Sequence, residues 1–249
     1  MQQETMPVLK DLVLIGGGHS HVAVLKRFGM EPIPGVRVTL IARDVHTPYS
    51  GMLPGFVAGH YQFDQAHVDL RPLCQFAGAR LLHDEAIGID TANRHVLCRA
   101  RPPVSYDVLS INIGSRPGVA GVPGAANFTL PVKPINRFVE HWTGLVERVL
   151  KQSGPQRIGV VGAGAGGVEM VLAAQYRLRY LFNERGRDSE ELEFHLVSRS
   201  ERILPAFEEG VGARFEKVLE ERGIMVHRGS AAAEVNRDGL TLVGGLRIE

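Results

Sequence analysis

The segment Gly162-Ala163-Gly164-Ala165-Gly166-Gly167 decides how this 249-residue chain folds. It follows the apolar run RIGVV at residues 157–161, which is typical of a buried strand, and it opens a helical pattern over residues 168–181. Strand, glycine turn and helix in this order are the context in which the pattern G-x-G-x-x-G is specific. Such a turn presents the amide groups of a helix N-terminus to a diphosphate. We therefore expect a dinucleotide to be held by Gly162, Gly164 and Gly167.

The end of the next strand predicts which dinucleotide binds there. Residues 194–197 (FHLV) close the strand–helix–strand unit, and an acidic residue after them would bind the ribose of NAD. Ser198 and Arg199 stand at this position instead. A serine and an arginine tolerate or attract a 2′-phosphate, which favours NADP over NAD. The alternative is that Arg199 is a solvated surface charge.

A second glycine turn, GGGHSH at residues 16–21, lies 146 residues earlier in the chain. The run DLVLI (11–15) precedes it and the run VRVTLI (36–41) follows, which together predict a second strand–helix–strand unit. Its first two glycines fit G-x-G-x-x-G, but His21 stands where a small residue normally lets helix and strand pack closely. Either the helix is displaced or the imidazole lies near the ligand. A glycine turn without a ligand is the remaining alternative.

We expect a second diphosphate at this first turn. Gly16 allows the tight bend, and Gly18 lets the backbone approach the ligand at the start of the helix. Polar side chains at the helix start are expected to contact the ligand, and these are His19, Ser20 and His21.

The end of the strand after the first turn also departs from the usual pattern. Ala42 stands where an acidic residue normally binds the ribose hydroxyls, and Arg43 and Asp44 follow it. We expect Arg43 to contact the cofactor, with Asp44 as a ribose ligand two positions late. The histidines around this region have no Asp, Glu or Cys partner at ligand spacing, so we expect no metal site.

The repeated order of strand, glycine turn, helix and strand predicts an α/β fold of two Rossmann-like, three-layer nucleotide-binding units. Residues 118–124 are rich in Gly and Pro, as linkers are. We therefore place the first domain at residues 1–120 and the second at residues 121–249. Short apolar runs suggest a small antiparallel stretch in the first domain, at Leu81-Leu82, 86–90 and 95–98. Further helices are expected at 20–28, 135–150 and 211–222, and further strands at 108–113, 224–227, 233–235 and 240–243.

Composition excludes several other classes of protein. Hydrophobic residues make up 44% and charged residues 22%, which is ordinary for a globular protein and argues against disorder. A formal net charge of +1 gives no reason to expect a nucleic acid partner. The two cysteines form no C-x-x-C pair, which favours a reducing, cytoplasmic location. No run of about 20 apolar residues could span a bilayer, and no apolar region of a secretory signal is evident near the N-terminus.

The residues between the two units resemble a known family. The stretch SINIGSRP at residues 110–117 is similar to the A-T-G-S-x-P segment of the pyridine nucleotide-disulfide oxidoreductase superfamily, with Asn112 and Ile113 in place of alanine and threonine. The resemblance implies FAD at the first turn and NAD(P)H at the second. It also implies a backbone contact to adenine at Ala86 and a catalytic position near the nicotinamide for Glu169. Two further cofactor-binding residues follow from it, Gly114 and Ser115.

A narrower resemblance covers the segment that follows the first unit's second strand. Residues 52–55 (MLPG) with Gly59 are similar to the P-x-L-P-x-x-x-x-G loop beside the flavin in type II NADH dehydrogenases and sulfide:quinone reductases, which implies a flavin contact for Pro54. Residues 16–21 and 47–55 (TPYSGMLPG) also resemble the flavoprotein domain fused ahead of selenide, water dikinase in some bacteria.

These resemblances imply an FAD-dependent NAD(P)H oxidoreductase. Hydride passes from nicotinamide to flavin and on to an acceptor, either a quinone or a small oxidised species such as a selenium compound. No redox-active disulfide motif follows the first helix, so no thiol relay is expected. The alternative is a non-catalytic FAD/NAD(P)-binding module that acts as a sensor or docking domain. A methyltransferase or short-chain dehydrogenase would explain one glycine turn but not two.

The resemblance also predicts the domain arrangement and partners of the full-length protein. In the family the nicotinamide domain is inserted into the FAD domain, and a return segment after it completes the flavin site. The chain ends at Glu249, so we expect a C-terminally truncated piece with both domains incomplete. A fused or associated selenide, water dikinase domain, a homodimer and a peripheral membrane location of the full-length form are left open as predictions.

Overall fold

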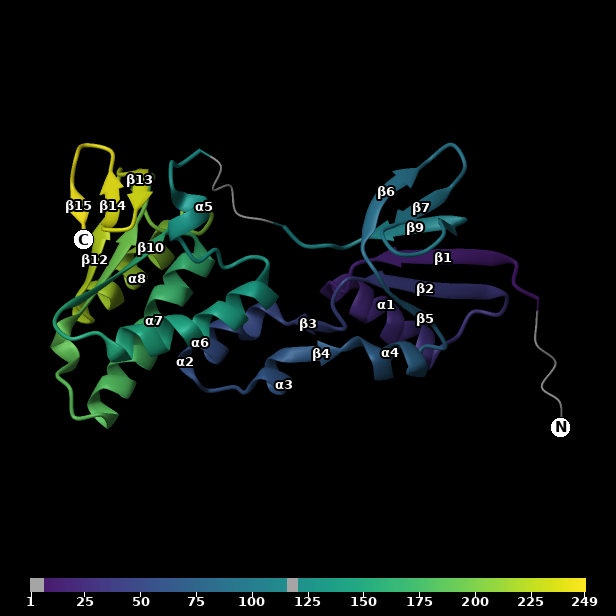
Figure 1. Ribbon diagram of the computed structural model, residues 1–249, viewed down its shortest axis with the longest axis horizontal. Coiled ribbons are helices and arrows are strands. Elements are labelled where there is room, and N and C mark those ends of the chain that lie inside the picture. The colour runs from purple at the N-terminus through teal and green to yellow at the C-terminus, as the bar shows by residue number, and fades with distance from the viewer. Residues whose placement is uncertain (1–6, 116–120) are drawn as a thin grey trace. The chain divides into compact units, whose positions relative to one another are not determined.

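The computed structural model describes residues 7–115 and 121–249, which divide into two compact units (Figure 1). Unit 1 contains residues 7–49 and Phe63–Ser115, and unit 2 contains Ser50–Gln62 and 121–249. The sequence did not predict that Ser50–Gln62 groups with unit 2. The predicted domain boundary at residue 120 lies outside the described residues.

Unit 1 is built on a parallel sheet with the strand order β5-β2-β1-β9. Leu14 of this sheet packs with Leu25 and Leu70 from helices on one face. Because all four strands run the same way, their carboxyl ends meet at one edge, where ligands bind in folds of this class. The elements are β1 (Lys10–Ile15), α1 (His19–Met30), β2 (Val36–Ala42), α4 (Leu70–Phe76), β5 (Arg80–His83) and β9 (Val108–Ile111).

The other face of this sheet is covered by an antiparallel layer. Val96 and Cys98 of that layer pack against Val13 and Ile15 of β1, which alternate with the helix-facing residues. The layer consists of β6 (Ala86–Asp90), β7 (His95–Cys98) and β8 (Val104–Ser105).

Two of the three runs predicted for this antiparallel stretch are confirmed, and one is wrong. Leu81 and Leu82 belong to β5, which pairs in parallel with β2 through Leu40 and Ile41. A pair of apolar residues has no periodicity from which the strand direction could be deduced.

A short antiparallel strand pair, whose strands are separated in sequence by Ser50–Gln62 of unit 2, completes unit 1. It pairs β3 (His46–Pro48) with β4 (His67–Asp69), and α3 (Phe63–Ala66) precedes β4. None of these short elements was predicted.

Unit 2 repeats the parallel arrangement in a sheet with the order β10-β11-β12. Phe194 and Leu196 of β11 are fully buried together with Leu178 and Phe182 of α7. The elements of this core are α2 (Leu53–Ala58), α6 (Ile135–Lys151), β10 (Gln156–Val161), α7 (Ala165–Glu184), β11 (Leu192–Val197), α8 (Glu209–Glu221) and β12 (Ile224–His227).

The remaining elements of unit 2 surround this core. Val197 packs on a small antiparallel sheet with Val235 and Leu242. That sheet and the short helical turns comprise η1 (Ser50–Met52), α5 (Ala125–Phe128), η2 (Ser189–Glu191), β13 (Ala232–Asn236), β14 (Gly239–Leu242) and β15 (Arg247–Ile248). The predicted α/β fold with two Rossmann-like units is thus confirmed. No helix of the described residues is both long and apolar enough to cross a lipid bilayer.

Candidate functional site

The second glycine turn connects β10 to α7 at the carboxyl edge of the unit 2 sheet. Gly162 has a φ of +108°, which favours glycine, and its amide donates to the carbonyl oxygen of Val197. A methyl group at Gly167 would overlap the carbonyl oxygen of Gly162, so a side chain there would push the helix off the turn. Methyl groups at Gly162 and Gly164 would meet open space. The first and third glycines are therefore required by the fold, while Gly164 leaves bare backbone at the helix start.

The start of α7 has the properties of an anion site. Gly164 is the N-cap residue, no side chain caps the first amides, and the first turn carries no acidic residue. The helix is 20 residues long, so unpaired amides and the helix dipole favour a negative group at this end. Glu169, predicted to lie near the nicotinamide, is exposed one turn further along the helix.

The turn after β11 presents one arginine. Ser198 is buried, and its hydroxyl donates to the Ser200 carbonyl oxygen at 3.0 Å and accepts from the Ser200 amide at 3.2 Å. The Ser198 amide donates to the carbonyl oxygen of His227, which ties the turn to β12. Arg199 is exposed at the tip. The Ser198 hydroxyl thus holds the turn, whereas Arg199 faces solvent, and the predicted cofactor contacts of both residues stay predictions.

The first glycine turn is packed differently. Gly16 has a φ of +89°, and its amide donates to the carbonyl oxygen of Ile41. A methyl group at Gly16 or Gly18 would overlap Asn112, which follows β9. Gly18 also donates its amide to the Asn112 carbonyl oxygen at 3.2 Å. A close approach that requires Gly18 is therefore made by Asn112 of the protein itself, and the predicted approach of a diphosphate stays a prediction.

The buried side chain of His21 connects this turn to β9. The side chain is 1% exposed; Nδ1 lies 2.6 Å from the Gly16 carbonyl oxygen and Nε2 lies 2.9 Å from Ser110 Oγ. Burial lowers the pKa of His21, against the hydrogen bond to Gly16, which raises it. Both ring nitrogens are engaged by the protein, so His21 holds the turn, and its predicted contact with the cofactor stays a prediction.

Other predicted residues of unit 1 lie around the carboxyl edge of its sheet. His19 and Ser20 are exposed in the first turn of α1, where Gly18 is an N-cap without a side chain. The ring of His19 packs edge-on against Tyr49 with centroids 4.5 Å apart. Arg43 is exposed after β2 and pairs with Asp44 at 2.9 Å. No side chain caps the first amides of α1, and its first turn carries no acidic residue.

The predicted residues Ala86, Gly114 and Ser115 follow other strands of unit 1. Ala86 begins β6, just after Asp84, whose amide donates to the carbonyl oxygen of Ala42 at the end of β2. Gly114 has a φ of +77° and, like Ser115, is exposed beyond β9. The last two residues of the SINIGSRP segment lie outside the described part of the chain.

Pro54 belongs to unit 2, near the start of α2. It lines an open cavity of about 320 Å³ between α2, α7 and α8, together with His60, Tyr176 and Arg222. Within that unit Pro54 packs toward α7, and its predicted flavin contact stays a prediction.

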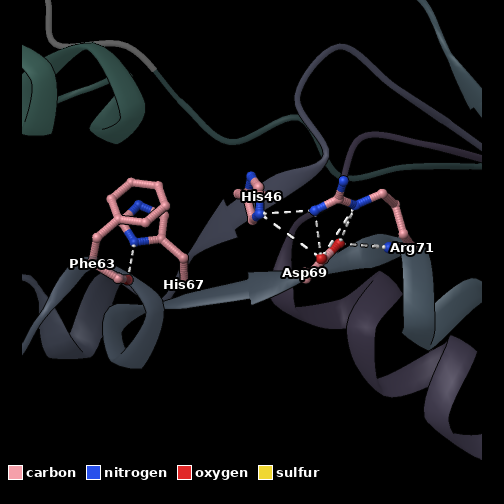
Figure 2. A network of polar contacts seen from close by, with 5 residues as sticks. All are labelled: His46, Phe63, His67, Asp69 and Arg71. Carbon is pink, nitrogen blue, oxygen red and sulfur yellow. Dashed lines mark hydrogen bonds and ion pairs between the residues drawn. The ribbon is translucent and has the colours of Figure 1, made fainter.

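Sequence reasoning missed a polar network around the β3–β4 strand pair of unit 1 (Figure 2). Asp69 accepts from the Arg71 amide at 2.9 Å and pairs with the Arg71 guanidinium, which lowers the pKa of Asp69 to about 2. His46 lies 3.8 Å from the same carboxylate. His67 stacks on Phe63 with centroids 3.8 Å apart and bonds to the Phe63 carbonyl oxygen through Nδ1. The Asp-x-Arg pattern before a helix was the available signal, since Asp69 is the N-cap of α4.

Neither cysteine has the setting of a redox thiol. Cys74 and Cys98 are free and buried. Burial raises the pKa of Cys74 to about 11 and raises that of Cys98 as well, which keeps both thiols protonated at neutral pH. Over residues 7–115 and 121–249, no three His, Cys, Asp or Glu side chains gather into a potential metal site.

Comparison with known proteins identifies the family. Residues 10–247 match the family model of the pyridine nucleotide-disulphide oxidoreductases. The chain is 28% identical over 240 residues to the NADH dehydrogenase-like protein YutJ of Bacillus subtilis, covering 94% of this chain and 59% of that protein. It is 24% identical over 248 residues to the type II NADH:quinone oxidoreductase Ndh of Mycobacterium tuberculosis, covering 93% and 52%. The chain thus spans between half and three fifths of these relatives.

Solved structures give the same fold. The structure of NDH2 from Plasmodium falciparum in complex with NADH has a TM-score of 0.82 to this chain at 15% sequence identity, covering 94% of this chain and 50% of that one. At this level of identity the likeness establishes the fold. The superfamily resemblance expected from the sequence is confirmed by these findings, while the likeness to a dikinase-fused domain stays a prediction.

Proposed function

Because the chain belongs to the pyridine nucleotide-disulphide oxidoreductase family, we propose that the whole protein is an FAD-dependent NAD(P)H oxidoreductase. FAD is held at the first glycine turn, in unit 1, and NAD(P)H at the second, in unit 2. The flavin and nicotinamide supply the hydride chemistry, and the residues of this chain bind and orient them.

The observation that carries the proposal is the pair of uncapped helix starts. Each of α1 and α7 begins at a glycine N-cap after a parallel strand, without a side-chain cap and without an acidic residue in its first turn. This donor set fits a diphosphate. Open space beside Gly162 and Gly164 gives the second turn room for one.

NADPH is the proposed reductant. Arg199 is exposed in the turn after β11, and no acidic residue occupies the position that would repel a 2′-phosphate. Hydrogen bonds through Ser198 and Ser200, among them those from the amides of Gly229 and Ser230, hold the turn that presents this arginine.

The electron acceptor is proposed to be a quinone or another small oxidised species. A quinone acceptor is named for the mycobacterial relative, and that name supports the class. Reduction of a selenium compound rests only on the sequence resemblance. The same holds for a fused or associated dikinase domain, a homodimer and a cytoplasmic location. Both cysteines are buried with raised pKa values, so electron transfer through a thiol of the described residues is not part of the proposal.

The visible spectrum of the purified full-length protein tests this function. We expect a yellow protein whose flavin band is bleached anaerobically by NADPH and restored by a soluble quinone. A flavin band that NADPH never bleaches would contradict oxidoreductase activity. Colourless protein that still binds NADPH would favour the alternative, a nucleotide-binding module without turnover.

A further inference from the structure

We infer that His21 is a positioning residue for the FAD diphosphate: with Ser110 of β9 it fixes the first glycine turn in the shape that presents the first amides of α1. The inference rests on the proposed function, because it assumes that FAD binds at this turn. It concerns a residue at which this chain departs from the ordinary G-x-G-x-x-G pattern, in which the third position is small.

The neutral imidazole, which burial favours by lowering the pKa of His21, satisfies both of its contacts in one tautomer. A carbonyl oxygen can only accept, so Nδ1–H of His21 donates to Gly16 at 2.6 Å. The other nitrogen, Nε2, then carries a lone pair and accepts from the hydroxyl of Ser110 at 2.9 Å. The neutral ring therefore bridges the carbonyl group of the turn and the side chain of a strand. With 1% of His21 exposed, water does not compete for either bond.

The second turn of the same chain shows what this bridge replaces. Gly167 occupies the third glycine position there, and its α-carbon packs directly against the carbonyl oxygen of Gly162. His21 occupies the corresponding position of the first turn, and it reaches the corresponding carbonyl oxygen, that of Gly16, by a hydrogen bond. Unit 2 thus holds the third position of its turn by direct packing, whereas unit 1 holds it by the hydrogen bonds of His21.

Strand β9 and the residue that follows it hold the other side of the bend. Asn112 accepts the amide of Gly18 at 3.2 Å and donates its own amide to Ile15 at 2.8 Å. Gly16 is therefore tied to this segment through His21, and Gly18 is tied to it directly. A turn that the protein fixes in advance binds its ligand more tightly, since less ordering remains to be done on binding.

The test compares FAD affinity in variants of the full-length protein. We expect His21→Ala to raise the dissociation constant for FAD about tenfold or more, because Gly16 and Ser110 lose a buried partner. His21→Asn should restore part of the affinity, because its amide nitrogen can donate to Gly16 from nearly the position of Nδ1. Ser110→Ala should cost less than His21→Ala and add little to it in the double variant, because both remove the same bridge. Ser110→Thr, which keeps the hydroxyl, should bind FAD as the unmodified protein does.

Two further measurements separate positioning from general stability. NADPH binding at unit 2 should be unchanged in every variant, and affinities should be measured well below each variant's Tm. If His21→Ala and His21→Asn bind FAD as tightly as the unmodified protein, or equally weakly, the inference is overturned. If the unmodified full-length protein binds no FAD at all, the proposed function fails first and the inference falls with it.

Discussion

We propose that Arg199 determines the choice between NADH and NADPH, because it is exposed in the turn after β11. We expect Arg199→Glu to weaken NADPH binding by roughly 10- to 100-fold, the range for a lost hydrogen bond to a charged group. NADH has no 2′-phosphate and should bind within about threefold of the unmodified protein. Equilibrium titration with both nucleotides checks this.

Arg185→Glu is the matched control for this change. It makes the same charge reversal at an exposed residue at the far end of the 20-residue helix α7, roughly 30 Å from the glycine turn. It should leave both affinities unchanged. Equal losses of NADPH and NADH in Arg199→Glu would show that the arginine does not read the 2′ position.

Asp84 is a second residue that a single substitution can test, because its ionised carboxylate is expected to stabilise the fold. Its side chain is 3% exposed and accepts from Arg101 Nε at 2.8 Å and from the Glu85 amide at 2.7 Å. Burial acts to raise the pKa of Asp84, but hydrogen bonds from Arg101, Glu85 and Ala100 outweigh it and hold the pKa below its ordinary value. The carboxylate therefore stabilises the folded state above the pKa of the unfolded chain, and this contribution is lost as pH falls through the folded pKa.

Replacing Asp84 should therefore change stability in a pH-dependent way. We expect Asp84→Asn to lower the Tm by several degrees at pH 7, with the difference shrinking as the pH falls below about 4. Asp64→Asn, an exposed control in the same unit, should leave the Tm unchanged at both pH values. A difference in Tm that is constant from pH 7 to pH 3 would contradict the role of the ionised carboxylate.

At the scale of the elements, the packing of α7 on its turn can be tested with adjacent glycines. A methyl group at Gly167 would overlap the carbonyl oxygen of Gly162, whereas one at Gly166 meets open space. Gly167→Ala should therefore lower the Tm, and Gly166→Ala should leave it unchanged or raise it, because alanine favours the helix. Thermal unfolding followed by circular dichroism distinguishes the two. An equal decrease in both variants would mean that the turn does not hold the helix by this contact.

The elements also show where sequence reasoning succeeds. The strands predicted over 11–15 and 157–161 and the helix predicted over 135–150 lie within one residue of β1, β10 and α6. They could be predicted because apolar runs, and a helical stripe with Phe138 and Trp142, persist over their length. The antiparallel pair of β3 and β4 was missed, because three-residue strands are too short to show an alternating pattern. His21 could be singled out as a departure from the turn pattern, but the direction of its ring nitrogens depends on Ser110, which lies 89 positions away.

At the scale of the whole molecule, the account requires two dinucleotide sites with different occupants. Equilibrium dialysis of the flavin-depleted full-length protein with FAD and NADPH, separately and together, tests this most directly. We predict that each chain binds one FAD and one NADPH and that neither nucleotide displaces the other. The variant Gly167→Ala should lose NADPH binding and keep FAD binding. A single dinucleotide per chain, or displacement of one nucleotide by the other, would contradict it.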